Sequence, residues 1–86
     1  MSVTYPAVDA TERAAAEAVV ELRRAMAAFP RFNSAHEGFA VLLEEVDELK
    51  AEVWKSPSKR DPSAMRKEAV QVAAMALRFL VDCCEE

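Results

Sequence analysis

Three stretches of the chain place apolar residues every three or four positions, which is the spacing of an amphipathic α-helix. The first is predicted over residues 9–29, because Pro30 cannot continue a helix. The second is predicted over residues 34–55 and the third over residues 62–84. Each begins at or just after a side chain that can accept hydrogen bonds from the free N–H groups of a first turn, namely Asp9, Ser34 and Asp61.

The third predicted helix is apolar on two nearly opposite sides. One stripe contains Met65, Val72, Ala76, Phe79 and Cys83, and the other contains Val70, Ala74, Leu77 and Val81. A helix with two apolar faces needs neighbours on both sides. The chain can bury one face itself, and a second copy would most simply bury the other. The sequence therefore predicts an all-α fold, a small antiparallel bundle of three main helices completed by oligomerisation into a dimer or tetramer.

Length and composition narrow the class of protein. At 86 residues the chain holds one domain, predicted over residues 9–86 behind a flexible arm of residues 1–8. With 52% hydrophobic residues it is not a disordered tail, and its net charge of −4 opposes binding to nucleic acid. Neither a membrane-spanning run nor a signal-peptide pattern is present. Cys83 and Cys84 are adjacent and form no disulfide framework, so we expect a cytoplasmic protein without membrane or nucleic-acid partners.

The second predicted helix concentrates acidic side chains. Glu45, Glu48 and Glu52 fall on one face, and Glu48 has another glutamate rather than a basic residue four positions on. Glu68 lies on the next helix, and packing of the two apolar stripes would bring the acidic edges together. The simplest interpretation of acidic helical residues is a solvated surface. The unneutralised charge favours instead a hard divalent cation, for which Mg²⁺ is the economical candidate.

The motif Glu45-x-x-Glu48 is followed, after nineteen intervening residues, by Glu68-x-x-Gln71, and the pair resembles the paired signatures of the MazG-like all-α nucleoside triphosphate pyrophosphatases. The resemblance covers residues 36–82. It implies an enzyme that cleaves an NTP or dNTP to the monophosphate and pyrophosphate, with Mg²⁺, or alternatively Mn²⁺, as cofactor. By the same resemblance, Glu45, Glu48, Glu68 and Gln71 correspond to the metal-binding positions. An aspartate is expected at Gln71, and a neutral amide there should weaken metal binding.

A carboxylate outside the inner metal shell would accept the proton of the attacking water, and Glu44 and Glu48 are both candidates. Lys67 could steer a polyphosphate, or could simply be a solubilising charge. Arg78 could contact phosphate, or could pair with Asp82 four residues on. Trp54 could stack on a base, or could cover the end of the helix pair. The alternative functions are a non-catalytic module that binds a nucleotide or a protein through a degenerate metal site, and a plain assembly domain.

Overall fold

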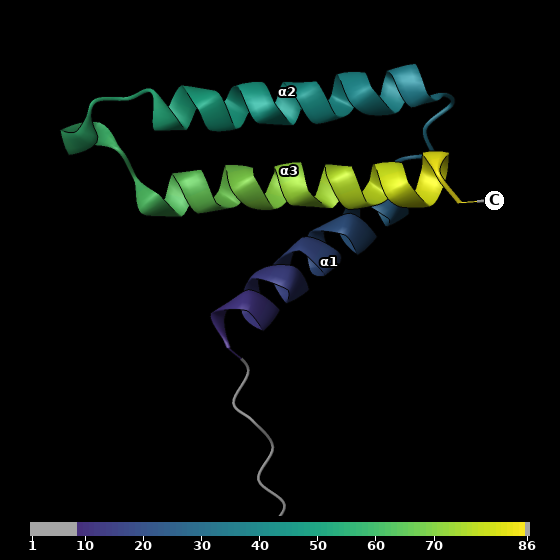
Figure 1. The fold of residues 1–86 in the computed structure, drawn as a ribbon, viewed down its shortest axis with the longest axis horizontal. Coiled ribbons are helices and arrows are strands. Elements are labelled where there is room, and N and C mark those ends of the chain that lie inside the picture. The colour runs from purple at the N-terminus through teal and green to yellow at the C-terminus, as the bar shows by residue number, and fades with distance from the viewer. Residues whose placement is uncertain (1–8, 86) are drawn as a thin grey trace, which may run out of the picture.

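The structure is a computed structural model that describes residues 9–85, so the predicted arm of residues 1–8 lies outside the described residues. The described part contains helices and no strands, which confirms the predicted all-α class. The elements in chain order are α1 (Ala10–Ala28), α2 (Ala35–Val53), the short 3₁₀-helix η1 (Pro57–Lys59) and α3 (Pro62–Cys83), as Figure 1 shows. None of the described helices is both long and apolar enough to cross a membrane.

The three predicted helix starts are confirmed by their capping geometry. Asp9, Ser34 and Asp61 are the N-caps, and each side chain accepts a hydrogen bond from a backbone N–H of the first turn at 2.8–3.1 Å. The caps satisfy donors that a helix cannot pair internally. The local sequence therefore determines where each helix begins.

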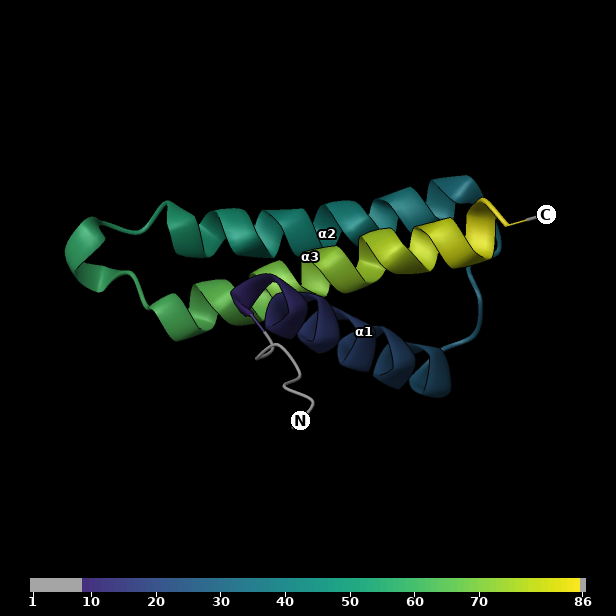
Figure 2. The same ribbon diagram turned by 60° about the horizontal axis from the view of Figure 1, so that its bottom comes forward.

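Helix α3 is the central element of the fold. It forms an antiparallel hairpin with α2, while α1 crosses it from another side, and both views place α3 between the other two helices (Figures 1 and 2). No Cα atom of α1 lies within 8 Å of a Cα atom of α2. The chain therefore covers part of both apolar faces of α3 itself, whereas the sequence pattern left one face entirely for a second copy.

The apolar core is small. Among the described residues its buried members are Ala18, Leu22, Ala74 and Met75, and no large side chain is fully buried. Many large apolar side chains remain exposed instead, among them Phe39, Leu43 and Val46 on α2, Val19 and Val20 on α1, and Leu80 and Val81 on α3. Because folding is driven mainly by burial of apolar surface, polar links between the helices carry more weight here than in a larger domain.

At Gly38 the α2 backbone lies close to two aromatic rings. A Cβ atom at this position would lie 2.9 Å from a ring carbon of Phe32 and 2.9 Å from a ring carbon of Phe79. Carbon atoms do not pack this closely without displacement of one of them. The absence of a side chain at Gly38 therefore lets both rings pack directly against the α2 backbone.

A buried arginine joins α3 to the end of α1. Arg78 is 3% exposed and donates hydrogen bonds from Nε to Asp82 Oδ2 at 2.9 Å and from Nη1 to the Ala25 carbonyl at 3.1 Å. Its Nη2 donates to the carbonyls of Phe29 and Pro30 at 2.9 and 2.8 Å. Two of these carbonyls belong to residues just beyond the last turn of α1. Arg78 thus fixes the direction in which the chain leaves α1.

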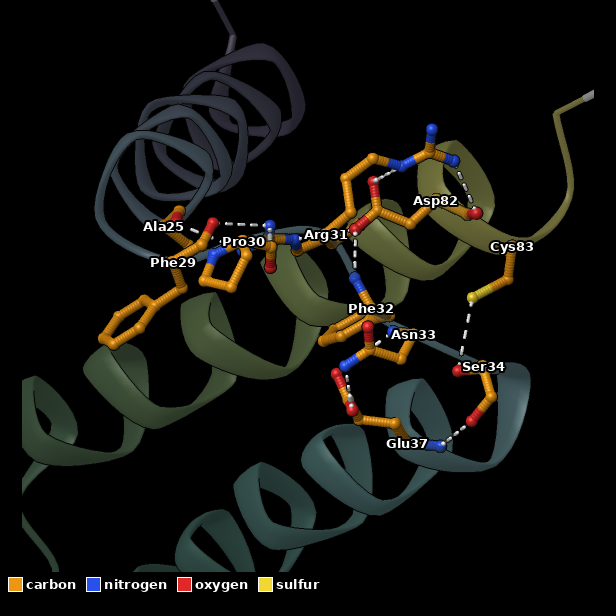
Figure 3. A network of polar contacts seen from close by, with 11 residues as sticks. Ala25, Phe29, Pro30, Arg31, Phe32, Asn33, Ser34, Glu37, Asp82 and Cys83 are labelled. Atoms are coloured by element: carbon orange, nitrogen blue, oxygen red, sulfur yellow. Dashed lines mark hydrogen bonds and ion pairs between the residues drawn. The ribbon is translucent and has the colours of Figure 1, made fainter.

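Asp82 completes this network from the other side. Its Oδ2 also accepts the backbone N–H of Phe32 at 3.1 Å, and Arg31 lies close to Oδ1 and donates to the Asp82 carbonyl (Figure 3). Burial raises the pKa of Asp82, but the hydrogen bonds from Arg78 and Phe32 and the charges of Arg78 and Arg31 outweigh it and hold the pKa below its usual range. Asp82 is therefore ionised and paired within the fold.

Candidate metal centre

Three carboxylates from two helices converge in the middle of the α2–α3 hairpin. Glu45 and Glu48 lie one turn apart on α2, and Glu68 lies opposite them on α3. One carboxylate oxygen from each residue lies within 4.8 Å of the corresponding oxygens of the other two. The structure thus brings together three of the four residues that the sequence assigned to a metal.

The cluster carries negative charge that no close cation neutralises. Burial raises the pKa of Glu45, and the charges of Glu48, Glu68 and Glu44 raise it further. Burial and the proximity of Glu48 likewise raise the pKa of Glu68, and the charge of Lys67 offsets this in part. No ion pair within 4.0 Å involves Glu45, Glu48 or Glu68 in the part of the chain that the structure describes. A bound cation would relieve this repulsion.

The donor set suits a hard cation. All three side chains offer oxygen, which Mg²⁺ and Mn²⁺ prefer, and neither histidine nor cysteine belongs to the cluster. Three carboxylate oxygens would leave about three of the roughly six positions around Mg²⁺ for water or for oxygens of another molecule. The residues present therefore fit a divalent cation that shares its coordination with an oxygen-rich ligand.

Gln71, the fourth predicted ligand, is engaged elsewhere. Its Nε2 donates a hydrogen bond to Glu21 Oε1 on α1 at 2.8 Å, and Glu21 also pairs with Arg24 at 3.1 Å. The carboxamide of Gln71 therefore links α3 to α1. Its amide oxygen is the one atom of the side chain that could serve a metal.

The remaining candidates lie around the cluster or away from it. Glu44 is exposed on α2, and Lys67 is exposed beside Glu68. Trp54 is 75% exposed at the end of α2, and Lys50 Nζ lies 5.6 Å from the centroid of its ring. Arg78 pairs with Asp82, as one of its two predicted roles required, and most of its N–H groups are already bonded. Glu52, predicted to share the acidic face, forms an ion pair with Lys55 at 2.8 Å.

A cavity of about 390 Å³ lies beside the cluster. Glu45 belongs to both, and the rest of the lining comes from the connection between α1 and α2, the first half of α2, and Arg78. Apolar contact is provided by Phe29, Pro30, Phe32 and Val41, and Glu37 adds a second carboxylate. Figure 3 shows Phe32 and Glu37 near one another at the start of α2. A ligand bound at the cluster would therefore have an aromatic-lined space next to it.

Sequence reasoning missed Glu37 and Phe32, which line the cavity beside the cluster, and Glu21, which accepts the hydrogen bond from Gln71. The Glu37 position was recognisable as part of a helix start, and its carboxylate does accept hydrogen bonds from the Asn33 backbone and side chain at 3.2 and 2.9 Å. The pairing of Glu21 with Gln71 spans 50 positions of the chain. No local pattern in the sequence indicates such a contact.

Comparisons of this chain with family models, with curated proteins and with solved structures find no significant match.

Proposed function

We propose that this chain is a Mg²⁺-dependent nucleoside triphosphate pyrophosphohydrolase of MazG-like type, which converts an NTP or dNTP to the monophosphate and pyrophosphate. The observation that carries the proposal is the convergence of Glu45, Glu48 and Glu68, with oxygen atoms within 4.8 Å of one another and no basic partner in ion-pair contact among residues 9–85. A divalent cation held there would polarise phosphate oxygens and stabilise charge that develops during hydrolysis.

The chain's own residues would divide the remaining work. Glu45, Glu48 and Glu68 hold the cation, and Lys67, exposed beside Glu68, attracts the polyphosphate. Of the two candidate proton acceptors, Glu48 lies within the cluster, whereas Glu44 is exposed next to it on α2. Glu44 is therefore proposed to accept the proton of the attacking water.

A second candidate function follows from Gln71. Because its amide is bonded to Glu21 and carries no charge, the site has three acidic ligands where the family pattern provides four. Fewer charged ligands weaken cation binding. In this alternative the chain binds a nucleotide with Mg²⁺ but does not turn it over.

The two functions are separated by one pair of measurements. The protein is incubated with Mg²⁺ and a panel of NTPs and dNTPs, pyrophosphate release is followed, and thermal stabilisation by the same ligands is recorded. Hydrolysis that is lost in Glu48→Gln, but retained in the control Asp47→Asn on the exposed side of the same helix, supports the enzyme. Thermal stabilisation without pyrophosphate supports the binding module, and the absence of both contradicts each function.

We also propose that the chain forms a homo-oligomer. A groove between α1 and α3 is lined entirely by alanine, valine and leucine, including Val19, Ala76 and Leu80, and Leu80 is 56% exposed. A second copy seated there would bury apolar surface that this small core leaves in water. Sedimentation at micromolar concentration should show a dimer or tetramer that Leu80→Glu dissociates. A monomeric wild-type protein would contradict the proposal.

A further inference from the structure

The cavity beside the carboxylate cluster has few free hydrogen-bond donors. Four hydrogen bonds use most of the Arg78 guanidinium, leaving about one of its five N–H groups. The backbone N–H of Phe29 is bonded to Ala25, and that of Phe32 is bonded to Asp82. Pro30 has no N–H, and the N–H of Glu37 is bonded to the Ser34 hydroxyl. A ligand entering the cavity therefore finds little to satisfy its own acceptors.

Acceptors, in contrast, remain available. A carboxylate has about four acceptor positions, and the Glu37 carboxylate uses two of them for Asn33, at 3.2 and 2.9 Å. These two contacts fix the orientation of the Glu37 side chain, which is part of the cavity lining. Glu45, the other carboxylate in the lining, belongs to the metal cluster. Glu37 is consequently the oriented acceptor that a non-phosphate part of a ligand would meet.

The spacing along α2 suits a nucleotide. Glu37 and Glu45 are eight residues apart, which corresponds to about 12 Å along the helix axis. A nucleotide whose phosphates lie at Glu45 would extend its base toward Glu37, with Phe32 and Phe29 in the same lining to contact the base. This arrangement rests on the proposed function, since it takes the cluster as the phosphate end.

We propose that Glu37 is a specificity-determining residue that selects nucleotides whose base carries an amino group, such as cytosine, over uracil and thymine. The 4-amino group of cytosine donates a hydrogen bond to a carboxylate, whereas uracil and thymine present a carbonyl oxygen at that position. Two acceptors facing each other repel, and the cavity offers almost no donor to replace the lost bond.

The test compares CMP with UMP, which differ in this part of the base ring while sharing sugar and phosphate. Their affinities are measured by calorimetry in excess Mg²⁺. We expect wild-type protein to bind CMP about tenfold more tightly than UMP, the effect of roughly one hydrogen bond to a charged acceptor. In Glu37→Gln the carboxamide keeps an oxygen for Asn33 but supplies a donor to the 4-carbonyl of uracil. The preference should then fall to about twofold or less, or reverse.

The control is Asp47→Asn, which removes the same charge from the exposed surface of α2 and should keep the CMP preference. Equal affinity of the wild-type protein for CMP and UMP would overturn the proposal, as would an unchanged preference in Glu37→Gln. Mg²⁺ binding and pyrophosphate release are measured in parallel. Pyrophosphate release without a base preference would refute the proposed role of Glu37 but not the hydrolase. A CMP preference that depends on Glu37, without pyrophosphate release, would refute the hydrolase but not the role of Glu37.

Discussion

Replacing Arg78 with methionine should strongly destabilise the protein. Methionine keeps much of the apolar stem and removes all five N–H donors of the guanidinium. The Phe29 and Pro30 carbonyls lose the hydrogen bonds that Arg78 donates, and the Asp82 carboxylate, whose side chain is 3% exposed, loses its closest cation. Breaking a buried ion pair from one side typically costs about 3–5 kcal/mol.

Such a loss is a large share of the roughly 5–15 kcal/mol that stabilises a typical domain. It should be especially severe here, because the apolar core contains few buried side chains. The free energy of unfolding is measured by urea titration with circular dichroism, at one fixed protein concentration so that any self-association is the same for each variant.

Arg66→Met provides a matched control on the same helix. Arg66 forms an ion pair with Glu17 on α1, but both side chains are largely exposed, at 56% and 43%. Exposed pairs contribute about 0–1 kcal/mol, so this variant should be nearly neutral. The double variant Arg78→Met with Asp82→Asn should lose less than the sum of the two single losses, because each removes the same pair. A loss below about 1 kcal/mol in Arg78→Met would refute the reasoning.

Three further outcomes are expected. Glu48→Gln should stabilise the metal-free protein by about 0.5 kcal/mol and so raise its melting temperature, because a like charge beside Glu45 is removed. The same variant should be stabilised less by added Mg²⁺ than the wild type. Gly38→Ala should cost about 1–3 kcal/mol in chemical denaturation, since the new Cβ displaces the Phe32 and Phe79 rings, although alanine favours helix by about 1 kcal/mol. The pKa of Asp82 is lower in the folded state than in the unfolded chain, so the stability that the ionised carboxylate contributes is present above about pH 4 and is lost as pH falls through the folded-state pKa. Asp82→Asn should therefore make the melting temperature depend less on pH in this acidic range.

Each of these has a clear contrary result. A Glu48→Gln protein that melts lower without metal would mean that the carboxylates do not repel one another. If Gly38→Ala leaves stability unchanged or raises it, the Phe32 and Phe79 rings must be able to move aside at little cost. The variant Ala40→Gly, at an exposed position of the same helix, measures the contribution of helix propensity alone. Parallel pH profiles for the wild type and Asp82→Asn would remove Asp82 from the acid-sensitive groups.

The helices could be predicted from the sequence because their determinants are local. Asp9, Ser34 and Asp61 cap within three residues, and Pro30 lies just beyond the end of α1. The proximity of Glu45 to Glu68 could also be predicted, since two amphipathic helices joined by a short loop pack their apolar stripes together and bring the flanking acidic residues close.

Contacts that depend on how one helix crosses another could not be predicted from the sequence. The sequence predicted that Arg78 contacts either phosphate or Asp82, and its ion pair with Asp82, four residues on, is a local contact. Its bonds to Phe29 and Pro30 span 49 and 48 positions and follow from the way α1 crosses α3. The bond from Gln71 to Glu21 is of the same kind. Periodicity identifies which face of a helix is apolar, but it does not indicate how far along a neighbour that face will lie.

Because α1 packs on α3 and keeps its backbone away from α2, almost all of its contacts could be reproduced on the α3 of another molecule. Exchange of an identical element between protomers changes little besides the connecting segment. In this chain that segment is clamped by Arg78 and Asp82, whose bonds to residues 29–32 hold the turn after α1 in place. Any exchange of α1 between two copies would therefore have to break the bonds that this pair of side chains makes to the connecting segment.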